Sequence, residues 1–270
     1  MNFKEEVERA SKEIGELDKS NPFTKDNGRI KVFYGEPSGG LIDCTVYDNR
    51  KDFLMEMSKW KYHSKFDFFT VSTGRMHTSY ARELLAEEAL KVGADFILFI
   101  DDDMMVPKNL FPALIKHADS ADIIAPLCFQ RIAPYNPVVY KIKEGRQSDG
   151  RKFIYNESNK DYPRNSVFQA DAVGFGVVLI KTEVLKKLPK PWFFSNQNVG
   201  EDIYFCLEAK KRGFKLLIDS TIKIGHMAAP RPITEIDFIR ASGTETDKTS
   251  HAEELKKHES EMTPLVEAHV

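Results

Sequence analysis

Three consecutive aspartates are the residues of this chain whose type and spacing most clearly could do chemistry. Asp101, Asp102 and Asp103 directly follow the apolar run 96–100. Successive side chains of an extended chain point to opposite sides, so Asp101 and Asp103 would share one side. Adjacent carboxylates repel one another unless a cation relieves the repulsion. The pattern predicts an Asp-x-Asp clamp for Mg²⁺ or Mn²⁺, shared with substrate phosphates, although an Asp-rich turn can also cap a helix or bind water.

Further candidate residues stand in the second half of the chain. The glycines of Gly174–Gly176 would let the backbone approach a ligand closely, although such bends are often only structural. Glu201 and Asp202 open a predicted helix, where the helix dipole would favour negative charge and tend to lower the pKa of Asp202. His226 follows an apolar stretch and is either a metal ligand or a structural hydrogen-bonding residue.

Alternating strands and helices are predicted to position the aspartates. The all-apolar run 96–100 is typical of a strand buried on both faces of a sheet. Thr78 is expected to cap the helix before it, and Val92-Gly93 to end that helix. Strand–helix alternation predicts an α/β fold, with a mostly parallel, doubly wound sheet that carries helices on both faces. Ligands bind at the carboxyl ends of such strands. The predicted strands cover residues 30–34, 68–72, 96–100 and 121–127, and the predicted helices cover 45–60, 78–92 and 107–116.

The alternation of predicted strands and helices ends after residue 127. Turn residues and charges predict a hairpin excursion there, and no second nucleotide-binding half follows. Strands are expected at 138–142, 152–155, 177–180, 216–218 and 222–224, with a helix opening at 201. The expected organisation is an N-terminal helical extension (1–28), a catalytic domain (29–240, with halves 29–127 and 128–240), and a C-terminal helical tail (241–270) that packs on the domain or pairs subunits.

Composition narrows the class of protein. Of the 270 residues, 41% are hydrophobic and 30% are charged, as in ordinary soluble globular proteins. The formal net charge of −2 gives no global positive field for a nucleic-acid partner. Three widely spaced cysteines favour buried free thiols in a reducing compartment. The charged first residues lack the apolar core of a signal peptide, and no apolar stretch approaches a transmembrane length. A cytoplasmic location is therefore predicted.

The order and spacing of these motifs resemble the GT-A glycosyltransferases, and more narrowly their family-2-like branch, which includes short microbial and phage-encoded members. The resemblance covers about residues 29–228. It rests on Asp101–Asp103, Gly174–Gly176, Glu201-Asp202 and Gly225-His226. Ala81-Arg82 also fits, with Glu83 in place of the family's usual Asn. The resemblance implies the GT-A (nucleotide-diphospho-sugar transferase) fold.

The resemblance also implies roles for individual residues. Asp101, Asp103 and His226 would hold Mn²⁺ or Mg²⁺ against the donor diphosphate, with Asp103 as the more direct ligand. Asp202 would be the general base of an inverting enzyme, with Glu201 beside it; in a retaining enzyme both would orient the substrate. The residues expected to bind the donor are Pro37, Ser38, Gly39, Ser72, Arg82, Asp101, Asp102, Gly174, Phe175 and Gly176.

The expected function is metal-dependent transfer of a sugar from a nucleoside-diphosphate sugar, with UDP favoured, to a hydroxyl. The acceptor would be a glycan, a lipid-linked sugar, a protein or a hydroxylated DNA base, chosen by loops 129–169 and 227–245. Basic residues, Arg131 among them, alternate with tyrosines in the first loop, although its acidic residues make a solvated loop the favoured interpretation over a DNA contact. A nucleotidyltransferase is the rival enzyme, disfavoured because Gly35–Gly40 contains no Lys or Arg. A non-catalytic nucleotide-sugar or carbohydrate-binding module is the rival of another class.

Overall fold

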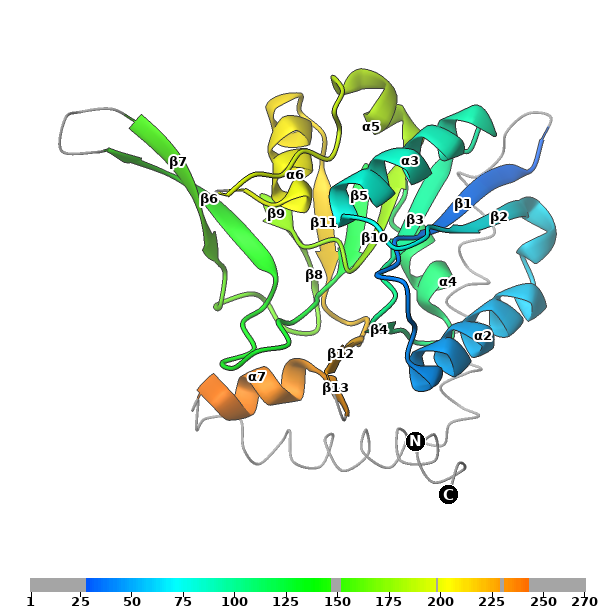
Figure 1. The fold of residues 1–270 in the computed structure, drawn as a ribbon, viewed down its shortest axis with the longest axis horizontal. Helices are drawn as coiled ribbons and strands as arrows, with labels where there is room; N and C mark the ends of the chain where they lie inside the picture. The colour runs from blue at the N-terminus through cyan, green and yellow to red at the C-terminus, as the bar shows by residue number, and fades with distance from the viewer. Residues whose placement is uncertain (1–27, 147–151, 198, 229–230, 243–270) are drawn as a thin grey trace.

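A seven-stranded sheet forms the centre of the molecule (Figure 1). The computed structural model describes residues 28–146, 152–197, 199–228 and 231–242. The strand order is β2-β1-β3-β10-β5-β11-β8; β10 and β8 run against the other five. The strands are β1 (Ile30–Glu36), β2 (Phe66–Ser72), β3 (Phe96–Ile100), β5 (Ile123–Pro126), β8 (Val167–Gln169), β10 (Val177–Lys181) and β11 (Leu216–Asp219).

Helices cover both faces of this sheet, because its central strands are apolar on both sides (Figure 1). Every residue of β3 is buried. Phe33 and Ile97 pack on one face with α3 (Thr78–Lys91), α5 (Thr182–Lys187) and α6 (Glu201–Lys211). Tyr34 and Leu98 pack on the other with α2 (Cys44–Lys59) and α4 (Leu110–Ile115), and a short 3₁₀ helix, η2 (His63–Lys65), precedes β2. The predicted mostly parallel sheet with helices on both faces is confirmed.

Helix ends follow local side-chain chemistry, with two departures from expectation. The cap of α3 is His77, whose ring nitrogen accepts from the backbone N–H of Ser79, rather than Thr78. Gly93 ends the helix as predicted, with φ +66°. The helix expected from Pro107 begins only at Leu110, after a turn.

The second half contains more irregular structure than its sequence suggests. Strand β10 runs antiparallel between β3 and β5, which strand–helix alternation does not predict. The stretch 222–224 is not a strand, and β12 (Gly225–Ala228) follows it. Two three-stranded sheets flank the main one. One contains β4 (Met104–Met105), β12 and β13 (Arg231–Ile233); the other contains β6 (Val139–Arg146), β7 (Lys152–Ser158) and β9 (Ala172–Val173).

The predicted hairpin is the β6–β7 pair, which projects from the body of the molecule (Figure 1). Helix α7 (Glu235–Ser242) passes through the expected domain boundary at residue 240. The predicted N-terminal helix and most of the predicted C-terminal tail lie outside the described residues, so the domain division stays a prediction. No helix in the described part of the chain has the length and apolar character to cross a membrane. Cys128 and Cys206 are buried free thiols as expected, but Cys44 is exposed.

Candidate active site

The three aspartates lie in a turn at the carboxyl end of β3, and their side chains take three different sets of partners. Asp101 pairs with Arg82, Asp102 accepts from Ser38, and Asp103 contacts His226. The prediction that Asp101 and Asp103 share one side assumed an extended chain, and the turn removes that condition. Within the described residues, no group of three or more His, Cys, Asp or Glu side chains could hold a metal ion. The expected three-ligand cluster is therefore not assembled.

Asp101 belongs to a buried ion-pair network. Arg82 Nη2 donates to both carboxylate oxygens of Asp101, at 2.9 and 3.0 Å, and Arg82 Nε lies 3.4 Å from Glu201 Oε1. Only 2% of the Arg82 side chain is exposed, and its guanidinium lies over the rings of Phe99 and Phe175. Burial opposes the charge of Arg82, but the surrounding carboxylates outweigh it and raise its pKa. Arg82 thus ties the aspartate turn to the start of α6.

A second buried arginine, Arg50 of α2, holds the backbone of the turn. Its Nη2 donates to the carbonyl oxygens of Asp101 and Met104, at 2.9 and 3.2 Å. Its Nε donates to Glu36 Oε2 at 3.0 Å, and the Tyr34 hydroxyl donates to the same oxygen at 2.6 Å. Burial raises the pKa of Tyr34, so its hydroxyl stays protonated and can donate. The network orients carbonyl groups and leaves the aspartate side chains free for other partners.

Asp103 and His226 face each other on the open side of the turn, the two residues that the resemblance assigned to one cation site. Asp103 Oδ2 lies 3.2 Å from His226 Nε2, because β12 pairs with β4 directly after the turn. His226 Nδ1 lies 2.8 Å from the carbonyl oxygen of Phe129, which can only accept, so Nδ1 carries a hydrogen. Burial lowers the pKa of His226, but the Asp103 carboxylate outweighs burial and the net shift is upward. Arg131 Nη1 also contacts Asp103 Oδ2, at 3.0 Å.

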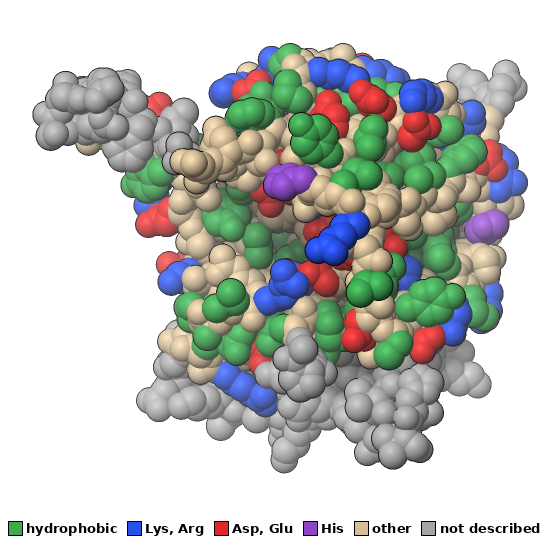
Figure 2. Space-filling model, in the orientation of Figure 1, with side chains coloured by type: hydrophobic (Ala, Val, Ile, Leu, Met, Phe, Trp, Pro, Cys, Tyr) green, Lys and Arg blue, Asp and Glu red, His purple; other side chains and the backbone are tan. Residues whose placement is uncertain are grey.

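A cleft of about 820 Å³ opens beside this pair, within the range of ligand pockets. Figure 2 shows basic and acidic side chains around a hollow in the middle of the face turned toward the viewer. The expected loop forms one wall: Ser38 donates to Asp102 at 2.9 Å through its hydroxyl, and to Thr73 Oγ1 at 3.0 Å through its backbone N–H. The lining residues are Ser38, Gly39, Gly40, Leu41, Asp43, Val46, Thr73, Gly74, Arg75, Asp102, Asp103, Arg131 and Met227.

Three of the expected donor-binding residues, Ser38, Gly39 and Asp102, line this cleft. The other seven do not: Pro37, Ser72, Arg82, Asp101, Gly174, Phe175 and Gly176. Pro37 is buried, and the Ser72 hydroxyl donates to Glu36 Oε1 at 3.3 Å. Arg131, Arg75 and Thr73 line the cleft without having been singled out for it from the sequence. Nothing in the local sequence marks Arg131 as a partner of Asp103, because the contact depends on a short loop after β5.

Asp202 stands at the first turn of α6, beside the glycine motif. A Cβ added to Gly174 would lie 2.4 Å from Val138 Cγ1 and 3.5 Å from Asp202 Oδ2, so glycine is required there. Phe175 is buried, and the carbonyl of Gly176 accepts from the backbone N–H of Asp101 at 2.8 Å. Burial raises the pKa of Asp202, with the Glu201 charge adding to it. The expectation of a low pKa is therefore wrong, because desolvation and a like charge outweigh the helix dipole.

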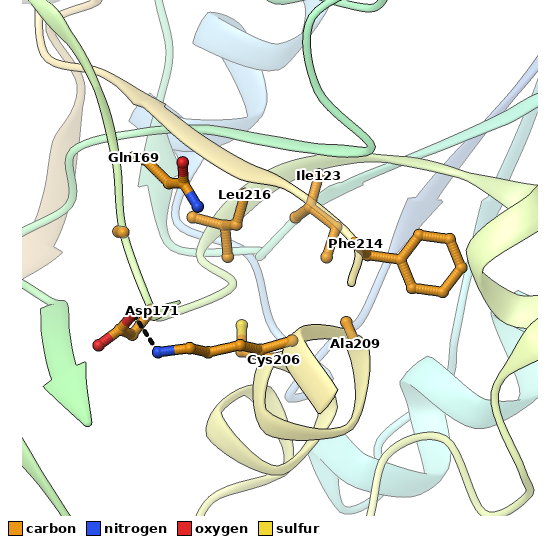
Figure 3. A pocket seen from close by; sticks show the side chains of 9 residues that line it. Ile123, Gln169, Asp171, Cys206, Ala209, Phe214 and Leu216 are labelled. Atoms are coloured by element: carbon orange, nitrogen blue, oxygen red, sulfur yellow. Dashed lines mark hydrogen bonds and ion pairs between the residues drawn. The ribbon is translucent and has the colours of Figure 1, made fainter. Parts of the chain in front are cut away.

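A much smaller cavity, of about 20 Å³, lies between β11 and α6 (Figure 3). Leu216, Phe214 and Cys206 line it, and Lys210 pairs with Asp171 at its rim. Such a volume has room for about one water molecule. It is too small for a nucleotide, so the large cleft is the candidate active site.

Comparisons with known proteins add evidence on the fold. No protein-family model matches the chain, and no curated protein matches it. Among solved structures, A197 from STIV superposes with a TM-score of 0.52 at 19% identity, over 77% of this chain and 92% of that chain. A structure of GalNAc-T7 with UDP, GalNAc and Mn²⁺ superposes with a TM-score of 0.44 at 12% identity, over 76% of this chain and 44% of that one. The likeness to A197 concerns the fold alone, which in this chain is an α/β fold built on a mostly parallel sheet with helices on both faces.

Proposed function

We propose that this chain is a metal-dependent glycosyltransferase that moves a sugar from a nucleoside-diphosphate sugar, with UDP favoured, to an acceptor hydroxyl. The observation that carries the proposal is the cleft, into which Asp102, Asp103, Arg75 and Arg131 all project at the carboxyl ends of the strands. A donor diphosphate needs positive charge around it, and this cleft combines two arginines with Asp103, whose carboxylate also contacts His226.

Asp103 and His226 are the residues that would hold the cation. Their facing oxygen and nitrogen atoms form a mixed ligand pair, which suits Mn²⁺ better than Mg²⁺, since Mg²⁺ prefers oxygen ligands. Both oxygens of Asp101 already accept from Arg82, so Asp101 contributes by positioning the turn. When bound, the cation would neutralise charge on the departing diphosphate.

Asp202 is the proposed general base. It lies next to Glu201 and beside Gly174, and it is not among the residues that line the cleft. Its raised pKa makes it a stronger base than an ordinary aspartate, provided that it is ionised at the working pH. Proton removal from the acceptor hydroxyl would contribute about 10²- to 10⁴-fold to the rate.

Binding and product analysis test this proposal together. UDP-, GDP-, dTDP- and CMP-sugars are screened by thermal shift with and without Mn²⁺, since a ligand at 100 times its Kd stabilises the folded state by about 2.7 kcal/mol. We expect one nucleotide class to raise Tm only with Mn²⁺, and slow donor hydrolysis to release the nucleoside diphosphate. Release of pyrophosphate when a nucleoside triphosphate and a sugar 1-phosphate are supplied instead would favour the nucleotidyltransferase. Binding without turnover would favour the non-catalytic module.

The variant that tests the general base is Asp202→Asn, which keeps the shape of the side chain and removes its basicity. We expect it to bind the donor and Mn²⁺ as the unchanged protein does, while kcat for transfer falls about 10²- to 10⁴-fold. Unchanged turnover would remove Asp202 from the mechanism. Absence of any Mn²⁺-dependent nucleotide binding would contradict the donor site. Acceptor identity, cytoplasmic location and pairing of subunits through the C-terminal tail stay predictions.

A further inference from the structure

Arg131 occupies an unusual place in the cleft, because it contacts the same oxygen atom that His226 contacts. Arg131 Nη1 lies 3.0 Å from Asp103 Oδ2, and His226 Nε2 lies 3.2 Å from that oxygen. Together with His226, the guanidinium neutralises a carboxylate that would otherwise face the cleft with an uncompensated charge. Arg131 thus contacts Asp103 Oδ2, the oxygen atom that would bind the proposed cation.

The loop that carries Arg131 is well placed for a change of partner. Residues 131–134 are exposed, and 53% of the Arg131 side chain is accessible. The loop is anchored on both sides, because Gln130 N donates to the carbonyl of Asn136 at 3.0 Å and the Phe129 carbonyl orients His226. An ion pair whose arginine is largely exposed to solvent contributes little free energy, so exchanging it costs little. The backbone can stay in place while the long side chain moves within the cleft that it lines.

We infer that Arg131 is an exchangeable counter-ion, which neutralises Asp103 in the free protein and pairs with the donor's diphosphate once a divalent cation is held by Asp103 and His226. This inference rests on the proposed function and adds a specific donor-binding residue to it. A guanidinium and a divalent cation repel each other, so they would not share Asp103 Oδ2. The diphosphate would be the nearest new anion in the cleft, and a guanidinium binds it through paired charge-assisted hydrogen bonds.

The inference predicts effects of opposite sign on two ligands. Arg131→Ala removes a competitor for Asp103, so Mn²⁺ alone should bind about 2- to 5-fold more tightly, the value of one exposed ion pair. The same variant loses a charge-assisted contact to the diphosphate, so UDP in saturating Mn²⁺ should bind roughly 10- to 100-fold more weakly. Mn²⁺ binding is measured by electron paramagnetic resonance on the free protein, and UDP binding by calorimetry.

Two variants serve as matched controls. Arg131→Lys keeps the charge and should restore Mn²⁺ affinity to near that of the unchanged protein, with partial recovery of UDP binding. Arg75→Ala removes an equal charge from the same cleft. Since the charged partners of Asp103 within the described residues are His226 and Arg131, Arg75→Ala should leave Mn²⁺ affinity closer to that of the unchanged protein.

The outcomes separate this inference from the proposed function. If the unchanged protein binds neither Mn²⁺ nor UDP, the proposed function fails and the inference fails with it. If it binds both and Arg131→Ala alters neither affinity, the proposed function stands and Arg131 is only a surface ion pair. If Arg131→Ala weakens both ligands, Arg131 supports the shape of the site and the exchange is contradicted. Tighter Mn²⁺ with weaker UDP supports it.

Discussion

Two arginine–aspartate pairs are formed by aspartates of one short turn, and their shortest contacts are nearly equal in length. The Arg82–Asp101 contact is 2.9 Å and the Arg131–Asp103 contact is 3.0 Å. Their surroundings differ greatly, since 2% of the Arg82 side chain is exposed against 53% of the Arg131 side chain. The buried pair joins the end of β3 to α3 and α6, whereas the open pair lies at the wall of the large cleft.

This difference shows that the length of an ion pair says little about what the pair does. A buried pair is costly to break, because removing one partner leaves an uncompensated charge away from water. An exposed pair is screened by solvent and exchanges partners at little cost. The buried pair therefore suits positioning, and the open pair suits ligand binding. The predictions below test this division between the two sides of the turn.

The largest effect is expected from Arg82→Met. The variant leaves the Asp101 and Glu201 carboxylates without their shared counter-ion, so the free energy of unfolding should fall by about 3–5 kcal/mol. Urea denaturation of the full chain measures this. The matched variant on the open side, Arg131→Met, should change it by less than about 1 kcal/mol. Equal losses in both variants would show that burial does not separate the two pairs.

A second prediction concerns the aspartates themselves. Asp103→Asn removes a proposed ligand, so Mn²⁺ affinity should fall by at least about 10- to 100-fold, the loss seen even when an outer partner of a metal ligand is removed. Asp101→Asn should lower Mn²⁺ affinity much less and lower stability more, because its carboxylate serves Arg82. Electron paramagnetic resonance measures the Mn²⁺ affinity of both variants, and thermal unfolding measures their stability. Equal loss of Mn²⁺ affinity in the two would make Asp101 a ligand as well.

Much of the fold was predictable from local patterns. The apolar run 96–100 and the capping and glycine signals around residues 78–93 gave β3 and the bounds of α3 to within a residue or two. These features depend on neighbours in the sequence, so the sequence contains the information. The antiparallel β10 was not predictable in the same way, because parallel and antiparallel strands buried on both faces share one apolar pattern.

Only part of the site was predictable, because three of the ten expected donor-binding residues line the cleft. The resemblance implied that Asp103 and His226 act at one cation site, and the structure brings their side chains within 3.2 Å although 123 residues separate them. The partners of Asp101 and the upward shift of the Asp202 pKa depend on burial, which the sequence does not reveal. Arg50 and Glu36 gave no signal at all, because a charged residue in a helix or at a strand end is ordinarily exposed.

A third prediction concerns the space for an added side chain at two glycines, Gly174 beside Asp202 and Gly39 in the cleft. Gly174→Ala would place a Cβ 2.4 Å from Val138 Cγ1, so overpacking should destabilise the protein by about 1–3 kcal/mol. Gly39→Ala on the open side would meet only Asp102 Oδ2 at 3.6 Å, and should cost less than about 0.5 kcal/mol. Thermal unfolding measures both. Adding Val138→Ala to Gly174→Ala should recover part of the loss, and no recovery would contradict the steric cause.

The smallest expected effect is a displacement of the pH dependence of turnover. The pKa of Asp202 lies above its ordinary value of 3.8, through burial first and the Glu201 charge second. A general base is inactive when protonated, so kcat should fall as the pH decreases through this raised pKa. Measuring kcat at saturating Mn²⁺ and donor separates this acid limb from protonation of His226, which acts on metal binding in the free protein.

Glu201→Gln should move that limb, because it removes the like charge that helps to raise the Asp202 pKa. The acid limb of kcat should therefore lie at lower pH in Glu201→Gln than in the unchanged protein. Asp102→Asn, which removes a negative charge on the open side, is the matched control and should leave the limb in place, since Asp102 is not among the charges that shift Asp202. An acid limb that moves equally in both variants would mean that the Asp102 charge affects the Asp202 pKa as strongly as the Glu201 charge does. The proposed electrostatic separation of the cleft from Asp202 would then be contradicted.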